Sequence, residues 1–505
     1  MKFVNRYILT SVLAVVTLAF TSCITENSVS NKDRESVSLR AWIQLNRPDL
    51  LNNYQVNGDY YVEVLEEGGN NPVSGNSNEF DNEPIMDQDT CWVFYDVVGR
   101  DMNGRVCLTR DGSLAELSGT FSYMTHYVPF LNYAGSENQG LLEGTYLAMR
   151  NELKIGDKTL KLRRGSKVRL YLPSSIAYGE SGSSAEGGYE GQYSLDGSRS
   201  MIMEIDIKSV IKNPSDKELD MVEAYTVLDG WTQAEKAKTD SDSEDEEQTT
   251  TEDSSTTTED NTLKGLYYRM GFNPKSADVT SYRYVSPEKS GFSAPYRDSK
   301  KYADMNVVTK RINEILLERF GEGLAVAEQT DDTKVDTSLA INVWYVLRFL
   351  DGFVADTNIK EIREYLYNDK SGTDTPFIYR HSEANPDSES SSTISAWYYT
   401  MPNMHYDAYG EIITTSGYAY GIAGISASTT TEESSNSAVA YDYYNYYNYY
   451  NSYYGGYGGY YNYYNYPSYY YDYSVGTEDT TVTTTISTEI LPYTPLVFTI
   501  FVERN

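Results

Sequence analysis

The stretch NVWYVLRFLDGFVADTN, Asn342 to Asn358, decides the fold of this chain. Its first half alternates, with Val343, Tyr345 and Leu347 on one face, which predicts a strand covered on one side. Asp351-Gly352 then predicts a tight turn, after which a second strand starts. The stretch is therefore predicted to form a β-hairpin.

The same design occurs twice, which indicates a duplicated unit. The earlier copy of the hairpin places Asn103-Gly104 at its turn. Two further matches follow in the same order along the chain. The matching segments are CWVFYDVVGRDMNGRVCLT (91–109) with the opening stretch, YLPSSIAYGE (171–180) with YTMPNMHYDAYGE (399–411), and MIMEIDI (201–207) with LVFTIFV (496–502).

These motifs resemble the FKBP-type peptidyl-prolyl isomerases, in particular lipoproteins of Bacteroidetes envelopes. GSKVRLYLPSSIAYGE (165–180) is similar to the family's strand into Pro-x-x-x-Ala-Tyr-Gly, and TPLVFTI (494–500) is similar to its final strand. The resemblance covers about residues 55–212 and, more loosely, 265–505. It implies an α+β fold of two FKBP-like modules, each an antiparallel sheet wrapped around a short helix, with long insertions and low-complexity segments. The alternative is that such short motifs are general β-sandwich patterns.

The composition limits the partners of this 505-residue chain. With 73 acidic and 41 basic residues, the net charge is −32. Nucleic acid and anionic membrane surfaces are excluded as partners, because binding them requires a basic face. The three histidines have no ligand spacing and no phosphate-binding loop follows a strand, so no metal and no cofactor are predicted.

The amino terminus predicts export. Residues 1–22 combine a basic start with an apolar run too short to span a bilayer, which is typical of a signal peptide. Cys23 follows two small residues and resembles the lipidated cysteine of bacterial lipoproteins, although ordinary cleavage nearby is the alternative. Residues 23–54 are predicted to be a lipid anchor and tether. The protein is thus expected in the bacterial cell envelope, on the periplasmic or surface side of the outer membrane, and bound to the membrane through its lipid alone.

Two low-complexity segments divide the rest of the chain. The first module is predicted at 55–212, an acidic Ser/Thr-rich linker region at 213–262 and the second, divergent module at 263–505. Within the second module, residues 441–473 hold 19 tyrosines. A core cannot use so many phenols, because each buried hydroxyl needs a partner. The tract suits contact with an envelope protein or a glycan, and low-complexity disorder is the alternative.

Cys91 and Cys107 are predicted to be buried free thiols. Across the hairpin, Cys91 lies about six residues up the strand from the residue that Cys107 faces, which is roughly 20 Å at ~3.3 Å per residue. A disulfide cannot reach that far.

The family's pocket, carried over by position, gives the candidate site residues. In the second module these are Tyr345, Asp356, Tyr409 in Ala-Tyr-Gly and Phe498, which are predicted to be catalytic. Ala355 replaces the family's phenylalanine. No segment is recognised for the helix that carries the pocket tryptophan in the family. In the first module Tyr178 and Tyr146, which follows Thr145 in the helix, are predicted to contact substrate. Val97, Cys107, Thr145 and Met203 stand where the family has aromatic residues, and Leu108 stands at its aspartate, although a two-residue shift would restore Tyr95.

Two functions remain open. Rotation of a prolyl bond needs no nucleophile, only a dry aromatic pocket and a few hydrogen bonds. The first hypothesis is therefore an isomerase, or a chaperone derived from one, that acts weakly on unfolded or proline-containing polypeptides in the envelope. The second is a non-catalytic envelope protein that binds protein or glycan through its clefts and the Tyr-rich segment.

Overall fold

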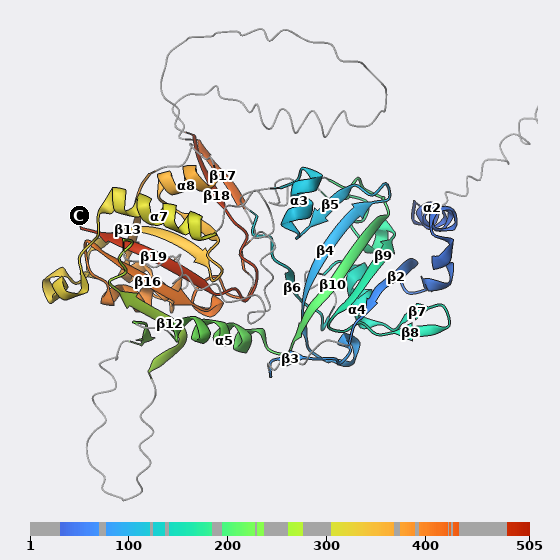
Figure 1. Ribbon diagram of the computed structural model, residues 1–505, viewed down its shortest axis with the longest axis horizontal. Helices are drawn as coiled ribbons and strands as arrows, with labels where there is room; N and C mark the ends of the chain where they lie inside the picture. Colours follow the sequence, from blue (N-terminus) through green and yellow to red (C-terminus); the bar gives the residue numbers. More distant parts are fainter. Residues whose placement is uncertain are drawn as a thin grey trace, which may run out of the picture.

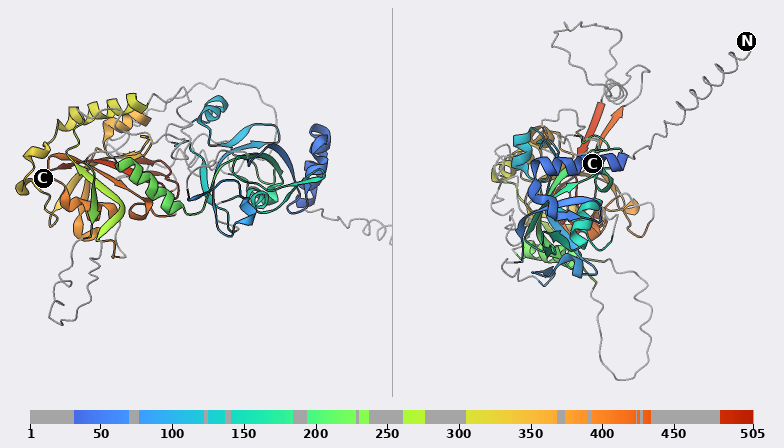
Figure 2. Two further views of the ribbon diagram at one scale, coloured as in Figure 1. Left: turned by 60° about the horizontal axis from the view of Figure 1, so that its bottom comes forward. Right: turned by 90° about the vertical axis from the view of Figure 1, so that its right-hand side faces the viewer.

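A computed structural model describes residues 31–69, 77–121, 125–136, 141–183, 194–227, 230–236, 261–275, 305–367, 374–388, 393–422, 424–425, 428–433 and 482–504. These residues form two units that lie next to each other along the long axis of the molecule (Figures 1 and 2). We call residues 31–212 the first unit and residues 213–504 the second unit.

The first unit contains one antiparallel sheet in the order β1-β2-β9-β10-β4-β5, with β3 paired to β10 and β6 paired to β4. Its strands are β1 (Tyr54–Gln55), β2 (Tyr60–Glu67), β3 (Glu79–Phe80), β4 (Trp92–Asp101), β5 (Val106–Thr109), β6 (Phe130–Tyr133), β9 (Ser166–Leu172) and β10 (Met201–Ile211). Its helices are α2 (Asn31–Asn46), α3 (Gly112–Ser118) and α4 (Glu143–Arg150), and β7 (Leu153–Ile155) pairs with β8 (Lys158–Leu160) in a separate hairpin. Three 3-10 helices complete it, η1 (Pro48–Asn53), η2 (Ile85–Asp87) and η3 (Ser174–Ile176).

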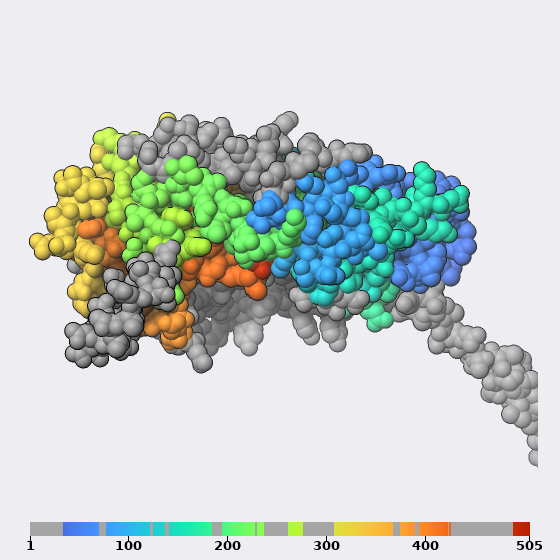
Figure 3. Space-filling view, turned by 90° about the horizontal axis from the view of Figure 1, so that it is seen from below, coloured from blue at the N-terminus to red at the C-terminus, as the bar shows by residue number. Residues whose placement is uncertain are grey.

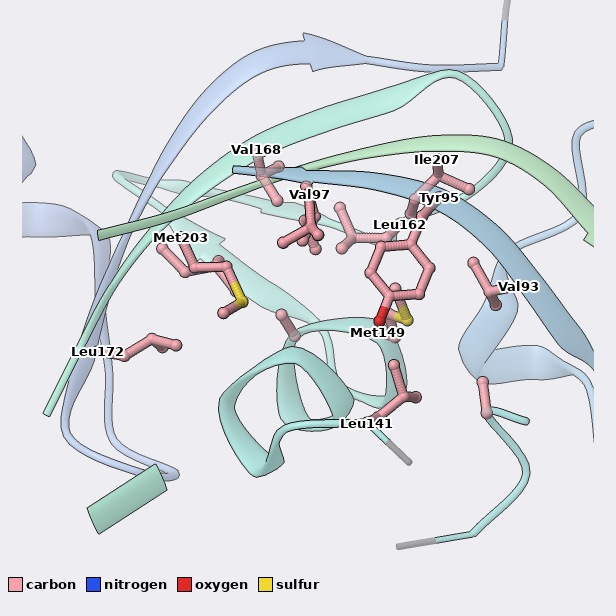
Figure 4. Close-up of a cluster of buried hydrophobic side chains, with 14 of the residues drawn as sticks. Val93, Tyr95, Val97, Leu141, Met149, Leu162, Val168, Leu172, Met203 and Ile207 are labelled. Carbon is pink, nitrogen blue, oxygen red and sulfur yellow. The ribbon is translucent and has the colours of Figure 1, made fainter. Parts of the chain in front are cut away.

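The core of the first unit lies between this sheet and α4. Alternate residues of β4, namely Val93, Tyr95 and Val97, are buried with Met149 of α4 (Figure 4). The alternation follows from the two-residue period of a strand, which sends every second side chain to the same face. The predicted arrangement of an antiparallel sheet on a short helix is confirmed.

The second unit has a sheet in the order β11-β12-β16-β19-β13-β14, with β15 paired to β13. Its strands are β11 (Thr232–Glu235), β12 (Thr262–Met270), β13 (Ala340–Phe349), β14 (Val354–Thr357), β15 (Phe377–Arg380), β16 (Ala408–Thr414) and β19 (Leu496–Glu503). A separate ribbon pairs β17 (Ser428–Glu433) with β18 (Val482–Ser487). The helices are α5 (Pro214–Thr226), α7 (Met305–Phe320), α8 (Lys360–Tyr367) and α9 (Ser395–Thr400), and the 3-10 helices are η7 (Val326–Glu328), η8 (Asp331–Thr333), η9 (His381–Glu383), η10 (Met401–Asn403) and η11 (Ser416–Tyr418).

The two sheets are built alike. Strands β2, β9, β10, β4 and β5 take the positions of β12, β16, β19, β13 and β14, and they come in the same chain order. The register agrees as well: Met203 pairs with Gly99 and Leu170 in the first sheet, as Phe498 pairs with Leu347 and Ile412 in the second. Together with the sequence repeats, this shared topology makes the chain an α+β protein with two FKBP-like units.

The turn predictions that built the repeat are confirmed. Gly104 and Gly352 occupy the two hairpin turns at φ +88° and +91°, where a residue with a side chain would be strained. Helix α7 buries Ile312 and Leu316 and is followed by Gly321 at φ +71°. Cys91 and Cys107 are both free and buried.

The prediction that the opening strand is covered on one side was wrong. Val343 and Leu347 pack on the face that holds α9, whereas Trp344 and Val346 pack in a second cluster with Ile312 of α7. Helix α7, inserted between β12 and β13, lies with α8 over the other face of the sheet (Figure 1). Both faces of β13 are therefore apolar environments, which strict alternation does not reveal.

Two segments predicted as tether and linker are helical parts of the units. Helix α2 packs on the first sheet, where Leu39 and Ile43 share a cluster with Tyr171 of β9. Helix α5 packs on the second sheet, where Val222 shares a cluster with Ile413 of β16. Each sheet is therefore preceded by its own helix, and the repeated unit is longer than the predicted modules.

Candidate functional site

The loop after β9 and the loop after β16 have the same backbone. Each forms one 3-10 turn and then an alanine, at φ −120°, ψ −113° for Ala177 and φ −122°, ψ −107° for Ala419. The glycine that ends each loop donates its N–H to the carbonyl of the first serine, at 2.8 Å in residues 173–179 and 2.7 Å in residues 415–421. PSSIAYG and TSGYAYG are therefore equivalent loops, and the counterpart of Tyr178 is Tyr420.

The predicted match of residues 399–411 with residues 171–180 is consequently wrong. Residues 395–403 are helical, and Ala408-Tyr409-Gly410 begins strand β16. The second unit contains two Ala-Tyr-Gly triplets. The loop equivalent to residues 173–179 begins with Thr415, where the first unit has Pro173. A search for proline followed by Ala-Tyr-Gly therefore finds Pro402 and the earlier triplet.

Tyr409, predicted to be catalytic, lies elsewhere. It is buried against α7, and its hydroxyl donates to the backbone carbonyls of Leu316 and Gly321 at 3.0 and 3.1 Å. These acceptors belong to the end of the helix, where carbonyl groups lack intrahelical partners. Tyr409 thus secures α7 to the sheet, and it belongs to a different cluster from Phe498.

Helix α9 supplies the pocket aromatic residue for which no segment was recognised. Its N-cap is Ile394, the N-cap of α4 is Leu142, and Trp397 therefore stands at the position of Thr145. The available signal was the parallel between ISAWYYTM and LEGTYLAM, which share the leading apolar residue, the small third residue, tyrosine and final methionine. The match was missed because residues 399–411, which include the end of this helix, were matched with residues 171–180 instead.

Four side chains from four elements meet in the second unit. Tyr345 of β13 donates its hydroxyl to Asp356 Oδ2 of β14 at 2.6 Å. The Trp397 ring meets Tyr345 and Phe498 of β19 edge to face, with centroids 5.9 and 5.8 Å apart. Edge-to-face contacts are the preferred geometry of aromatic pairs, so these rings hold one another in place. Three of the four residues predicted to be catalytic, Tyr345, Asp356 and Phe498, are thus brought together, and Trp397 joins them. We call these four residues the aromatic cluster.

The ionisable groups of the cluster are partly buried. Burial, and next the negative charge of Asp356, raise the pKa of Tyr345. Burial also raises the pKa of Asp356 itself, although the bond from Tyr345 opposes this. Tyr420 has a pKa of about 12, raised first by burial and then by the charge of Asp356, so it lies within electrostatic range of the same carboxylate. The site therefore holds partly buried phenols around one carboxyl group.

One polar atom of the cluster has no partner among the described residues. The indole N–H of Trp397 is buried and makes no hydrogen bond within this part of the chain. Buried donors are normally paired, because an unpaired one loses the hydrogen bond that it makes with water. Trp397 therefore offers a donor that a bound carbonyl group would satisfy.

The corresponding positions of the first unit are filled by smaller side chains. Val97 and Met203 lie in the buried core between sheet and helix (Figure 4), and the hydroxyl of Thr145 donates to the sulfur of Met203 at 3.1 Å. Tyr178 and Tyr146, predicted to contact substrate, are partly buried and pack against this same core. The first unit therefore keeps the loop tyrosine without the aromatic cluster.

Each loop is held by a glutamate from the helix that precedes its sheet. Glu35 of α2 accepts hydrogen bonds from the backbone N–H and the hydroxyl of Ser174. Glu218 of α5 accepts the same two bonds from Ser416, the bond to the hydroxyl measuring 2.8 Å. The signal for this pair was the repeat DRESVSLRAW and DKELDMVEAY, which falls in segments predicted as tether and linker. Glu218 thus positions the loop that carries Tyr420.

The shared strand order, the equivalent loops and the aromatic cluster define an α+β fold of two FKBP-like units, one of which keeps an aromatic site. No family model matches the chain, and no curated protein matches it.

Several solved structures are similar to the chain at low identity. The structure of the three FKBP domains of wheat FKBP73 is 11% identical, covers 89% of this chain and 94% of its own, and gives a TM-score of 0.18. FkpA from Escherichia coli is 14% identical over 41% of this chain and 71% of its own, with a TM-score of 0.22. A peptidyl-prolyl isomerase from Pseudomonas syringae pv. tomato is 16% identical, covers 35% of this chain and 95% of its own, and also gives a TM-score of 0.22. Because all three TM-scores are below 0.5, the assignment of the two units rests on their own topology and motifs.

Several predicted features lie outside the described residues. They include the signal peptide, Cys23 and the Tyr-rich tract 441–473. Within the described ranges, no helix is both long and apolar enough to cross a bilayer, and no three His, Cys, Asp or Glu side chains are grouped so that they could hold a metal ion.

Proposed function

We propose that the second unit binds proline-containing polypeptide at the aromatic cluster and catalyses rotation of the prolyl bond. The observation that carries this proposal is the meeting of Tyr345, Asp356, Trp397 and Phe498 from four separate elements. A structural core would not need a partly exposed carboxyl group at its centre, since burial of a charge is costly. A proline ring against aromatic faces, with its carbonyl near buried donors, is the ligand that suits this set of groups.

Catalysis of this rotation requires only that the protein binds the twisted amide more tightly than the planar one. The barrier to rotation is ~18–20 kcal/mol because the amide loses its resonance as it twists. An apolar aromatic wall favours the twisted amide, which is less polar than the planar one. The hydroxyl of Tyr420 and the buried indole N–H of Trp397 are candidates to bind the carbonyl oxygen. Ala355 stands where the family has a phenylalanine, which removes one wall, so we expect modest acceleration.

The first unit takes a supporting role in this proposal. Its equivalent positions hold Val97, Thr145 and Met203, which form core contacts with one another and leave no acidic group among them. Substitution there should change stability and leave the rate of isomerisation unchanged.

A proline-dependent peptide assay tests the proposal. Wild-type protein should accelerate cis-trans relaxation, and Asp356→Ala or Trp397→Ala should reduce the acceleration at least tenfold. Tyr409→Phe is the matched control, because it removes a buried hydroxyl of the same unit outside the cluster. Absence of acceleration by the wild type refutes catalysis, and binding of the peptide without acceleration would favour the non-catalytic alternative.

We also propose that the chain is exported and lipidated on Cys23, on the basis of the signal-like residues 1–22. The placement in the envelope and contact with protein or glycan through residues 441–473 belong to the same proposal. Metabolic labelling with a fatty-acid analogue should mark the wild type and leave Cys23→Ser unlabelled. A wild type without label contradicts the anchor.

A further inference from the structure

The two units touch through a surface of the second unit that faces the first. This receiving surface consists of helix α5, the turn 349–353 and the loop 489–494. Tyr493 meets the ring of Trp92 edge to face, with centroids 4.9 Å apart. Helix α5 lies over the junction, where it is coloured green in Figure 3. Its Lys217 donates to Glu79 of the first unit at 2.6 Å, while the next residue, Glu218, binds Ser416 of the second.

A histidine of the first unit contacts the turn 349–353 of the receiving surface. The ring of His126 stacks on Phe349 with centroids 4.2 Å apart, and its Nε2 lies 2.8 Å from Asp351 Oδ2. Arg110, which is buried, pairs with Glu489 at 2.9 Å. Aromatic stacking, a buried ion pair and apolar contact make this junction a specific interface.

The first unit has the same backbone elements in equivalent positions, with more polar side chains: Asp101 stands at the position of Phe349 and Ser198 at that of Tyr493. Helix α2 replaces α5, the turn 101–105 replaces 349–353, and the loop 194–199 replaces 489–494. Glu35 and Glu218 make the same bonds, and Ser198 and Tyr493 have the same unusual φ of +54° and +52°. The match therefore extends to backbone geometry.

In the first unit this surface is an open groove of about 630 Å³. Residues of α2, the turn and the loop line it, among them Arg34, Ser38, Trp42, Met102, Arg105 and Arg199. In the second unit the matching space is closed by Phe94, Leu131 and Ile211 of the first unit, which leave about 20 Å³. One receiving surface is thus covered by an FKBP-like unit, and the other is not covered by the described part of the chain.

The face that inserts into the receiving surface also has a counterpart. In the first unit it lies on β4 and β6, where Phe94 pairs with Leu131. In the second unit Asn342 of β13 pairs with Ile378 of β15, so Ile378 stands at the position of Leu131. Ile378 is 53% exposed, and its neighbour Phe377 is 38% exposed. An apolar edge strand in this position presents surface for association.

The free surface and the free face lie at opposite ends of the molecule. Strand β15 pairs with the start of β13, which also pairs with Glu503 near the carboxyl terminus. Figures 1 and 2 show this terminus at the end of the molecule opposite α2. A second copy can therefore continue the arrangement that the first unit already makes with the second.

We propose that the chain binds further copies of itself head to tail, with the β15 face of one copy seated in the α2 groove of the next. The contact is heterologous, because two different surfaces meet, so it extends into chains of copies instead of closing as a twofold dimer. It uses the same elements as the junction between the two units, although Asn342 replaces Phe94 on the inserting face, and it does not depend on the proposed isomerase activity.

Sedimentation of the chain from residue 24 onward, which keeps every described residue, tests this at 0.15 M salt to screen the repulsion between acidic copies. The wild type should form species of two and more copies as its concentration rises. Ile378→Glu removes the inserting face and Ser38→Arg fills the groove, so each variant alone should remain a monomer. Leu117→Glu is the matched control, since Leu117 is an exposed leucine on α3, and it should associate like the wild type.

Mixing the two variants separates head-to-tail contact from other association. Ile378→Glu keeps its groove and Ser38→Arg keeps its β15 face, so an equimolar mixture should give a dimer and nothing larger. Circular dichroism and melting of each variant confirm that it is folded. A wild type that stays monomeric at every concentration, or a folded pair of variants that does not dimerise on mixing, overturns the proposal.

Discussion

The glutamate that holds the loop of the second unit should make stability depend on pH. Burial raises the pKa of Glu218 from 4.5 to about 7, although its two hydrogen bonds from Ser416 oppose the shift. The folded chain therefore holds a proton on Glu218 between these pH values, where the unfolded chain has lost it. Stability from this group is fully present below pH 4.5 and is lost as the pH rises through about 7.

The size of the effect follows from the two pKa values. At 1.36 kcal/mol for each pH unit, the carboxyl group contributes about 3 kcal/mol less at pH 8 than at pH 4. Glu218→Gln keeps a neutral group of the same shape that can still accept from the serine N–H. Because other groups titrate as well, the informative quantity is the unfolding free energy of the wild type minus that of Glu218→Gln.

Urea unfolding of both proteins from pH 4 to pH 8 measures this difference. We expect it to fall by about 3 kcal/mol over that range, whatever its value at pH 4. Hydrogen exchange at the Ser416 amide reports on the same contact locally. A difference that stays constant with pH would refute the reasoning, and a difference that rises would reverse its sign.

Three further outcomes are expected. Trp397→Ala should lower the free energy of unfolding by about 3–5 kcal/mol, measured by urea unfolding, because it removes the ring that contacts both Tyr345 and Phe498; a loss below about 1 kcal/mol would contradict its place in the core. Tyr409→Phe should cost about 1 kcal/mol in the same experiment through the lost hydrogen bonds to α7, and an unchanged midpoint would count against them. Burial raises the pKa of Cys91 and of Cys107 to about 11, so a thiol reagent should react with neither at pH 8 until denaturant is added, and rapid reaction of the folded chain contradicts their burial.

The sequence was sufficient for the elements whose local patterns are strong. The hairpins could be predicted because a glycine turn joins two apolar strands, and this fixed the register that places Tyr345, Asp356 and Phe498 correctly. Helix α7 could be predicted because its apolar residues recur at helical spacing.

What was missed depends on contacts between distant parts of the chain. Tyr409 and Tyr420 both stand in Ala-Tyr-Gly, and only the pairing of β16 with β19 shows which triplet is the loop. Trp397 lies in a helix of six residues, too short for a periodic signal. The partnership of Glu218 with Ser416 spans 198 residues, and the repeat that marks Glu218 does not indicate which residue it contacts.

The most direct test of the central claim uses the indole N–H of Trp397. The claim is that one of two duplicated units binds proline at the aromatic cluster, which Trp397 joins to Tyr345 and Phe498. Titration of isotope-labelled protein with a proline-containing peptide should shift this indole signal, assigned by its absence in Trp397→Phe, and a matched peptide with alanine in place of proline should shift it much less. An indole signal that does not respond to the proline peptide at millimolar concentration, or responds equally to both peptides, would contradict the account.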